Sequence, residues 1–247
     1  MSKKVAIVIG INYIGTSNQL NGCINDADDL KQYLQTHQNY DEFIYMTDNS
    51  KMKPTSGNIL VQINNVVNRA IAGEVNDIWI SYSGHGTYTR DRNGDEDDGK
   101  DEMLVPLDYN VSGCIPDDTL HLILNKLPEN VKLTCLFDCC HSGTILDLKY
   151  RYVPGSTTNV VENQKSSINA HCIMLSGCAD TQTSADAYIS GQYAGAMTNA
   201  FLRSMLYYNH KLTCDQLISK MRSLLHKRYS QIPQLSSSYK VDKNTQF

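Results

Sequence analysis

The sequence predicts an α/β protein in which a mainly parallel central sheet is flanked by helices. Two observations support this fold class. Short apolar runs of strand length recur along the chain, and several of the segments between them space their apolar residues like an amphipathic helix. A strand that is apolar on both faces needs cover on both faces, which a parallel sheet between helical layers provides.

The expected strands are short, and the apolar core of each is long enough for one buried strand. Five such strands are expected, at Val5–Ile9, Phe43–Met46, Asp77–Tyr82, Leu133–Phe137 and Cys172–Leu175. Helical segments follow the first two of them, as expected for parallel strands that are joined by crossover helices.

Four helices are expected. The segment Asn25–Leu34 has acidic residues in its first turn, where they interact favourably with the helix dipole. The segment Gly57–Ile71 repeats apolar residues at intervals of three and four. Two further helices, Ala196–Tyr207 and Thr213–His226, are expected late in the chain.

Two segments lack any such pattern. Tyr88–Lys100 is acidic and contains glycine, so it is expected to form a surface loop. Tyr150–Asn169 is rich in Ser, Thr and Asn without an apolar period, so it is expected to be a flexible loop. No internal repeat and no second domain is visible, and one domain is expected over residues 1–247.

Composition excludes several classes of protein. Of the 247 residues, 41% are hydrophobic and 19% are charged, as in ordinary globular proteins. The net charge of −4 argues against a nucleic-acid partner, and no apolar run reaches the length of a membrane-spanning helix. The run Val5–Ile9 is too short for a signal peptide and lacks a cleavage site. The eight cysteines show no repeated CxxC spacing, so no zinc site is expected. A reducing, cytoplasmic setting, in which the thiols stay free, is expected for them.

Two of the expected strands end in reactive residues. One strand continues into Gly84, His85 and Gly86, and another into Asp138, Cys139 and Cys140. Because ligands bind beyond the carboxyl ends of parallel strands, both ends should lie at one edge of the sheet. A cysteine and a histidine brought together there can act as nucleophile and base. The N–H groups of Gly86 and Cys140 are expected to form the oxyanion hole.

Several blocks resemble the signatures of the metacaspases, which are relatives of the caspases. The two catalytic signatures are matched by Ser83–Gly86 and Asp138–Gly143. Further family motifs are resembled by Asn21–Ala27, by Ser176–Asp186 and by the block that begins at Gly195. The blocks occur in family order over nearly the whole chain, and the QACRG signature of caspases is absent. The resemblance implies a caspase-like fold. No Pro-rich or zinc-finger extension precedes the first expected strand, so the N-terminal prodomain of many relatives is expected to be absent or removed.

The resemblance also implies a role for each reactive residue. The family pattern makes Cys140 the nucleophile and Cys139 a variable position; alternation along a strand end already points the two in opposite directions. His85 is then the base. The neighbouring His141 is the competing candidate, and a structural hydrogen-bonding role is expected for it.

A specificity pocket for Arg or Lys before the scissile bond is implied in the same way. Selection of a cationic side chain needs carboxylates. By family position these are Asp26 and Asp138, together with Cys23 and Ser83. The alternative for Asp26 is an acid at a helix N-terminus, worth about 0.5 kcal/mol through the dipole.

Calcium is the expected cofactor. The segment Asp91–Glu102 resembles an EF-hand loop, but its sixth position is Glu96 instead of Gly and no helix flanks it, so a solvated acidic loop is favoured there. Metacaspases that need calcium bind it through four aspartates. The matching positions are Asp101, Asp117, Asp118 and Asp147, with Asp97 and Asp98 as competitors for the first. Asp117 and Asp118 also fit a helix N-terminus after Pro116.

The expected activity is therefore that of a calcium-dependent cysteine endopeptidase acting on proteins or peptides after Arg or Lys. The alternatives are a catalytically silent regulator of the same fold and a peptide ligase that shares the acyl-enzyme. A monomer is expected. Lys149, Arg151 and Lys165 lie in or beside the expected flexible loop and are candidate sites of self-cleavage.

Overall fold

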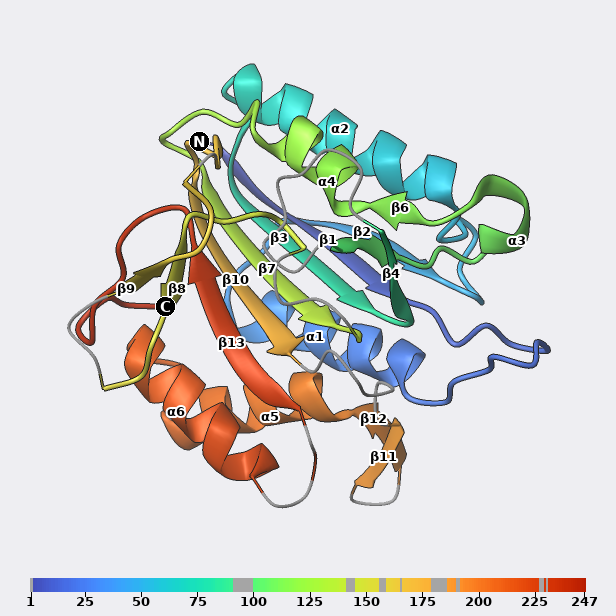
Figure 1. Cartoon of the computed structure of the whole chain (residues 1–247). Coiled ribbons are helices and arrows are strands. Elements are labelled where there is room, and N and C mark those ends of the chain that lie inside the picture. The colour runs from blue at the N-terminus through green and yellow to red at the C-terminus, as the bar shows by residue number, and fades with distance from the viewer. Residues whose placement is uncertain are drawn as a thin grey trace.

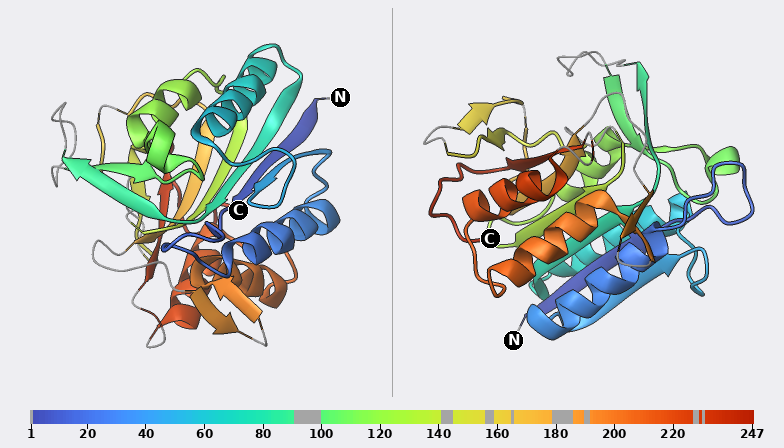
Figure 2. Two further views of the ribbon diagram at one scale, coloured as in Figure 1. Left: turned by 90° about the vertical axis from the view of Figure 1, so that its right-hand side faces the viewer. Right: turned by 90° about the horizontal axis from the view of Figure 1, so that it is seen from below.

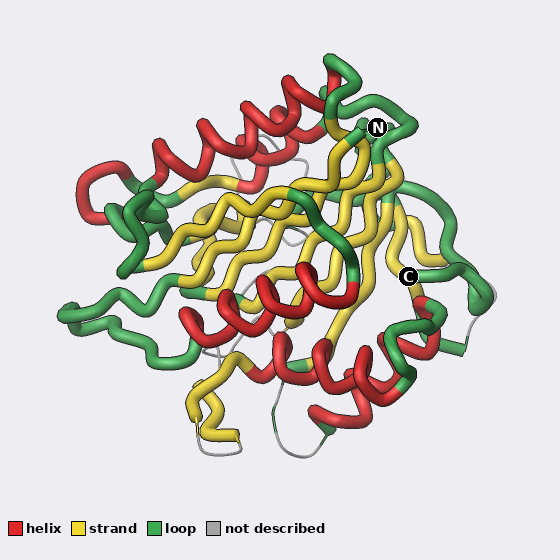
Figure 3. The backbone as a smooth tube through the Cα atoms, turned by 180° about the vertical axis from the view of Figure 1, so that it is seen from behind, coloured by secondary structure: helices red, strands yellow, loops and turns green. Residues whose placement is uncertain are grey.

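The computed structural model describes residues 2–90, 100–140, 145–155, 159–164, 166–178, 186–189, 192–226, 229 and 231–247. In this part of the chain an eight-stranded sheet lies between two layers of helices (Figure 1). Helices α2 (Ser56–Ile71) and α4 (Asp117–Leu124) cover one face. Helices α1 (Cys23–His37), α5 (Ala196–Tyr207) and α6 (Cys214–Leu225) cover the other, as Figures 2 and 3 show from below and from behind.

The strand order of the main sheet is β2-β1-β3-β7-β10-β13-β8-β9. Its first five members pair in parallel and contain the five strands expected from the sequence: β1 (Lys3–Gly10), β2 (Glu42–Thr47), β3 (Val75–Ser83), β7 (Lys132–Asp138) and β10 (His171–Cys178). The last three pair antiparallel: β13 (Ile232–Ser237), β8 (Tyr150–Tyr152) and β9 (Asn159–Val161). The predicted α/β class is confirmed.

The ends of two long helices are fixed by side chains that precede them. At the start of α2 the Thr55 hydroxyl accepts a hydrogen bond from the N–H of Asn58. Thr213 and Gln216 form a reciprocal capping box at the start of α6. All four helices expected from the sequence are present, and α1 begins two residues earlier than expected, at Cys23.

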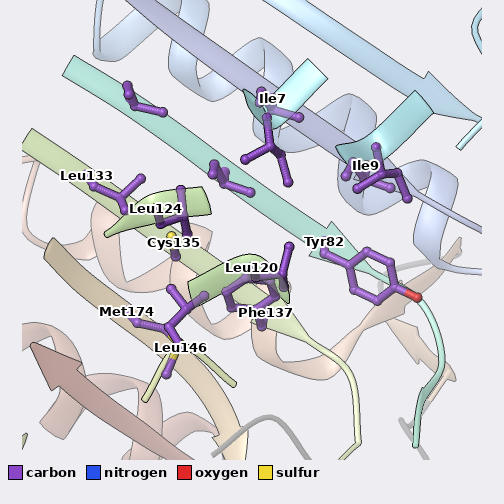
Figure 4. Close-up of a cluster of buried hydrophobic side chains, with 14 of the residues drawn as sticks. Ile7, Ile9, Tyr82, Leu120, Leu124, Leu133, Cys135, Phe137, Leu146 and Met174 are labelled. Carbon is purple, nitrogen blue, oxygen red and sulfur yellow. The ribbon is translucent and has the colours of Figure 1, made fainter. Parts of the chain in front are cut away.

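Two apolar layers hold the helices to the sheet. Because successive residues of a strand face opposite sides, Ile9 packs toward α2 and α4 while Val8 packs toward α1 and α5. Figure 4 shows part of the first layer, where Tyr82, Leu120 and Phe137 gather beside Ile9. The strands are thus apolar on both faces, as a covered parallel sheet requires.

Two smaller sheets lie at the edge where the parallel strands end. Strands β4 (Gly86–Arg90), β5 (Lys100–Leu104) and β6 (Ile115–Pro116) form one, with the short helix α3 (Tyr109–Ser112) between the last two. Strands β11 (Asp186–Ile189) and β12 (Gln192–Gly195) form the other. The surface loop expected at Tyr88–Lys100 is therefore strand at both ends, and residues 91–99 lie outside the described part.

The expectation of a flexible loop over Tyr150–Asn169 is corrected at two places. Strand β8 pairs with β13, and β9 pairs with β8, so both extend the main sheet. An ion pair joins Arg151 to Glu162. The phenol of Tyr152 is fully buried and donates to Asp215 at 2.8 Å. Three-residue strands are too short to show a period in the sequence, and pairing with a distant strand defines them instead.

Within the described residues, no helix has both the length and the apolar character needed to cross a membrane.

Candidate active site

The reactive residues follow two strands that are direct neighbours. Strands β3 and β7 pair in parallel, and their register ends with Ser83 opposite Asp138. Just beyond, the N–H of Gly84 donates to the carbonyl of Asp138 at 3.3 Å. His85 and Cys140 lie two residues past the last register pair, so the structure brings both to the same edge of the sheet.

Gly86 lies against the main chain of Cys140. A β-carbon placed on Gly86 would be 2.0 Å from the carbonyl oxygen of Cys140 and 3.3 Å from the β-carbon of Cys139. Only glycine permits this approach. The two residues expected to supply the oxyanion hole are therefore in main-chain contact.

The imidazole of His85 is oriented by a loop between β1 and α1. Its Nε2 lies 2.7 Å from the carbonyl oxygen of Asn18. A carbonyl oxygen only accepts, so Nε2 carries the proton and Nδ1 is the nitrogen left to take one. The sequence analysis missed Asn18, because a main-chain oxygen has no signature in the sequence.

This loop is held at both ends. The carboxylate of Asp48 accepts from the N–H groups of Asn12, at 2.7 Å, and Ile14, at 3.0 Å. The side chain of Asn12 accepts from the N–H of Cys23 at 2.9 Å, which ties the loop to the start of α1. Near the loop tip, the amide of Asn18 donates to the hydroxyl of Tyr109 at 2.9 Å. The loop that carries the Asn18 carbonyl is thus held by hydrogen bonds at three places.

The two adjacent cysteines have different surroundings. Cys139 is fully buried in the apolar layer beneath α2 and α4, whereas Cys140 is only partly buried. This is the alternation expected at the end of a strand. The competing base His141 lies outside the described residues.

The two acids of the expected pocket meet in the interior. Asp26, in the first turn of α1, and Asp138, at the end of β7, are each 1% exposed. Asp26 accepts hydrogen bonds from the hydroxyl of Ser83 and, at 2.8 Å, from the N–H of Gly195. Asp138 Oδ2 accepts from the N–H of Thr198 at 2.8 Å. Asp26 is therefore both a helix acid and part of this pair.

The acid pair lacks a cationic partner among the described residues. Among the described residues neither Asp26 nor Asp138 forms an ion pair, and Oδ1 of Asp138 has no hydrogen-bond partner. Burial raises the pKa of Asp26 well above its ordinary value, and the nearby charge of Asp138 adds to the rise. Burial likewise raises the pKa of Asp138. A cation bound beside such a buried pair would stabilise the charged form of both carboxylates.

Of the other two residues expected at the pocket, the structure places Ser83 against the acid pair. Cys23 is the first residue of α1 and is 3% exposed, three positions before Asp26. Ser83 is equally buried and bonds directly to Asp26. Gly195, whose N–H holds Asp26, belongs to a block noted in the sequence, but its role there was missed.

The aspartates of the expected calcium site lie on neighbouring elements. Strand β5, which contains Asp101, pairs with β6, and β6 leads directly into α4, which begins with Asp117 and Asp118. The carboxylate of Asp117 is 2% exposed and accepts from the N–H groups of Glu102, at 2.9 Å, and Asp118, at 2.8 Å.

Asp117 is buried close to two other acids, Asp118 and Asp147. Burial raises the pKa of Asp117 to about 7, and the charges of Asp147 and Asp118 add to the rise. Asp147 is itself 7% exposed and has a positive φ of 48°. Within the described part of the chain, no three His, Cys, Asp or Glu side chains are gathered as metal ligands. The oxygen donors nevertheless suit a hard cation such as Ca²⁺.

A thiol and an imidazole at the ends of adjacent parallel strands, beside a buried pair of carboxylates, have the arrangement of a thiol peptidase of caspase-like fold. The family model for the metacaspase peptidase C14 domain matches residues 3–149. The chain belongs to the metacaspase family and is a cysteine peptidase.

Relatives support the same assignment over nearly the whole of this chain. Metacaspase-1 of Lodderomyces elongisporus is 36% identical over 303 aligned positions, covering 99% of this chain and 67% of the relative. Metacaspase-1 of Saccharomyces cerevisiae is also 36% identical, covering 99% and 68%. The prediction of a metacaspase is confirmed.

Two solved structures are similar in fold. Protein GSU0716 from Geobacter sulfurreducens has a TM-score of 0.69 at 23% identity, covering 97% of this chain and 95% of that one. Caspase-1 from Spodoptera frugiperda has a TM-score of 0.64 at 12% identity, covering 96% and 87%. The expected caspase-like fold is confirmed.

Proposed function

We propose that this protein is an endopeptidase that cleaves after Arg or Lys, with Cys140 as nucleophile and His85 as base, and that Ca²⁺ activates it. The observation that supports this specificity is the buried carboxylate pair of Asp26 and Asp138, which has no cationic partner among the described residues. A guanidinium or ammonium group of a substrate supplies the missing positive charge.

The proposed reaction begins with transfer of the Cys140 thiol proton to Nδ1 of His85. The thiolate attacks the carbonyl carbon after which the chain is cut, and the N–H groups of Gly86 and Cys140 stabilise the negative oxygen. His85 then gives its proton to the leaving amine as the C–N bond breaks, which leaves a thioester. Water, deprotonated by His85, hydrolyses the thioester and restores the thiol.

Substrate selection in this proposal depends on the same pocket. Oδ1 of Asp138 is buried without a hydrogen-bond partner among the described residues, so it can accept from a substrate cation that reaches it. An aspartate side chain of the substrate would instead bring a third carboxylate beside Asp26 and Asp138. Cleavage after Asp is therefore excluded by charge.

The calcium part of the proposal assigns Asp101, Asp117, Asp118 and Asp147 as the residues that would hold the ion. Support comes from the mutual repulsion and burial of Asp117 and Asp147, which a divalent cation would offset. A bound ion would supply the positive charge that offsets the repulsion between these acids. Asp147 lies in the segment that follows Cys140, so its order affects the neighbouring site.

The direct test uses fluorogenic peptides that differ only in the residue before the scissile bond: Arg, Lys, Asp or Ala. Each is assayed with Ca²⁺ and with chelator, on the unaltered protein and on Cys140→Ala. Cleavage of the Arg and Lys peptides that depends on Ca²⁺ and on Cys140 is expected. Efficient cleavage of the Asp peptide, or full activity in chelator, contradicts the corresponding part of the proposal.

The alternative functions give different results in this assay. A silent regulator releases no fluorophore from any peptide. A peptide ligase passes the acyl group from Cys140 to an added amine, so mass spectrometry would find joined peptides in preference to hydrolysed ones.

We also propose that the protein is a monomer. Caspases pair through an edge strand of the sheet. Here β13 is covered by β8, and β8 by β9, within the same chain. Light scattering under dilute conditions should give the mass of one chain, and a stable dimer would contradict the proposal.

A further inference from the structure

Two buried tyrosine hydroxyls meet the main chain of His85. Tyr13 lies just after β1 and Tyr82 lies near the end of β3, and their side chains are 0% and 1% exposed. Figure 4 shows the Tyr82 ring in the apolar layer at the end of its strand, with the hydroxyl directed past that strand end. Phenylalanine would fill the same space, so the hydroxyl groups need a separate explanation.

Each hydroxyl binds one side of the His85 main chain. The N–H of His85 donates to the Tyr13 hydroxyl at 2.9 Å. The Tyr82 hydroxyl lies 2.8 Å from the carbonyl oxygen of His85 and can donate to it. The peptide groups before and after the imidazole are therefore both held by side chains from the core.

Val105, which follows β5, completes the arrangement. Its carbonyl oxygen accepts from Tyr13 at 2.7 Å and lies 2.9 Å from the Tyr82 hydroxyl, while its N–H donates to the carbonyl of His85 at 3.2 Å. The two hydroxyls are 3.1 Å apart. Each hydroxyl has a single proton: that of Tyr13 goes to the carbonyl of Val105, which leaves the proton of Tyr82 for the carbonyl of His85.

The first glycine of the Ser83–Gly86 block makes room for this network. A β-carbon on Gly84 would lie 2.8 Å from the Tyr82 hydroxyl and 3.0 Å from the Tyr13 hydroxyl. Burial keeps the pKa of both phenols far above the ordinary value, so the hydroxyls remain protonated donors throughout the working range of pH.

Tyr13 also touches the imidazole itself. The centroids of its ring and the His85 ring are 4.8 Å apart, with the planes inclined by 37°. One face of the imidazole is thereby limited by Tyr13, while Nε2 is held by Asn18.

We propose that Tyr13 and Tyr82 are positioning residues for His85: their hydroxyls clamp its main chain so that Nδ1 is held toward Cys140. The inference rests on the proposed role of His85 as base. The main-sheet pairing of β3 ends at Ser83, and beyond it the two hydroxyls add side-chain hydrogen bonds to the main-chain bonds of Gly84 and His85. A misplacement of about 1 Å in a catalytic group can cost on the order of a hundredfold in rate.

The test compares Tyr13→Phe and Tyr82→Phe with Tyr152→Phe. Tyr152 is a matched control, because it is also fully buried and its hydroxyl also makes a hydrogen bond, to Asp215, but on the distant strand β8. For the two clamp variants we expect kcat to fall by about 10- to 100-fold with KM nearly unchanged, because base positioning acts mainly in the transition state. The pH profile of kcat/KM should shift as well. Tyr152→Phe should lower Tm without changing kcat.

Two measurements separate this inference from the proposed function. If the unaltered protein cleaves, His85→Ala is inactive and both clamp variants behave like Tyr152→Phe, the clamp is overturned while the proposed function stands. If the unaltered protein cleaves nothing, the proposed function fails, and the clamp is judged from the titration of His85 by NMR in folded protein. A His85 titration that is the same in all three variants and in the unaltered protein overturns the clamp; a shift confined to the two clamp variants supports it.

Discussion

The carboxylates of Asp26 and Asp138 both lie against the α-carbon of Gly195. A β-carbon placed there would lie 2.2 Å from an oxygen of Asp138 and 2.5 Å from an oxygen of Asp26. The start of α5 can thus approach both acids only because residue 195 has no side chain, although its φ of −66° suits any residue.

The first prediction concerns that approach. Gly195→Ala should displace both carboxylates and lower kcat/KM for Arg peptides by about 10- to 100-fold, since overpacking a filled site typically costs about 1–3 kcal/mol. Gly57→Ala is the control. No atom lies within 4 Å of a β-carbon there, and residue 57 is helical, so that change should be neutral or stabilising. Equal activity in the two variants would show that the close approach has no role in cleavage.

The second prediction concerns pH and stability. Burial raises the pKa of Asp26 and Asp138 in the folded protein. A carboxyl group with a raised folded pKa stabilises the fold below its unfolded pKa of about 4, and that contribution is lost as pH rises through the folded pKa. Asp138→Asn removes this loss, so it should raise Tm relative to the unaltered protein at about pH 8 and have little effect near pH 4. Thermal unfolding across this range measures the difference.

The same substitution separates stability from function. Asp138→Asn should lower kcat/KM for Arg peptides by roughly 30- to 4000-fold, because removing one partner of a buried charge pair costs about 2–5 kcal/mol. A variant that is more stable at neutral pH but still cleaves Arg peptides at the full rate would exclude Asp138 from the pocket.

The third prediction concerns the two adjacent thiols. Cys140→Ala should abolish turnover, whereas Cys139→Ala should keep most of it and lose stability instead, because Cys139 is fully buried in the apolar layer. Alkylation by iodoacetamide, mapped by mass spectrometry, should label Cys140 first. Loss of activity in a folded Cys139→Ala protein would reverse the assignment.

The fourth prediction concerns calcium. Asp117→Asn and Asp147→Asn should each reduce activation by Ca²⁺ and raise the concentration needed for half-activation by at least about tenfold, because each removes a charged oxygen ligand. Glu129→Gln is a suitable control, since it removes one exposed acid that has no ion pair in the described structure. Titrations of activity against Ca²⁺ that coincide for all three variants would reject the assigned ligands.

The fifth prediction concerns self-cleavage. Added Ca²⁺ should produce fragments that end at Lys149, Arg151 or Lys165, and Cys140→Ala should produce none. Cleavage at Arg151 requires β8 to leave the sheet and its ion pair with Glu162 to break, so Glu162→Gln should increase that product. Lys165 lies outside the described residues. Peptide cleavage with no fragments in mass spectrometry would remove self-processing while leaving activation by calcium in place.

The parallel half of the sheet and its long helices were predictable, because their apolar residues follow simple periods. Strand β13 was not. It contains Pro233, and it buries Gln234, Ser236 and Ser237, so its residues show neither an apolar run nor an alternation. Its place is set by pairing with β10 on one side and β8 on the other.

Part of the candidate site was predictable for a related reason. His85 and Cys140 follow strand ends, and parallel strands end at one edge, so local sequence was enough to place them together. Asn18, Tyr13 and Gly195 act across 67, 72 and 169 positions of the chain. Such contacts depend on the folded arrangement of several loops, and a main-chain atom takes part in all three bonds.

The register of β3 against β7 also sets a distance. Ser83 and Asp138, which face each other across the strand pair, are residues of the proposed pocket, and His85 and Cys140, two positions further, are the proposed base and nucleophile. The two residues beyond each strand end can span at most about 7 Å. The two strand ends thus fix the spacing between the proposed specificity pocket and the proposed nucleophile and base. One residue inserted after Ser83 or Asp138 would change that spacing on one strand alone, so these ends should tolerate substitution better than any change of length.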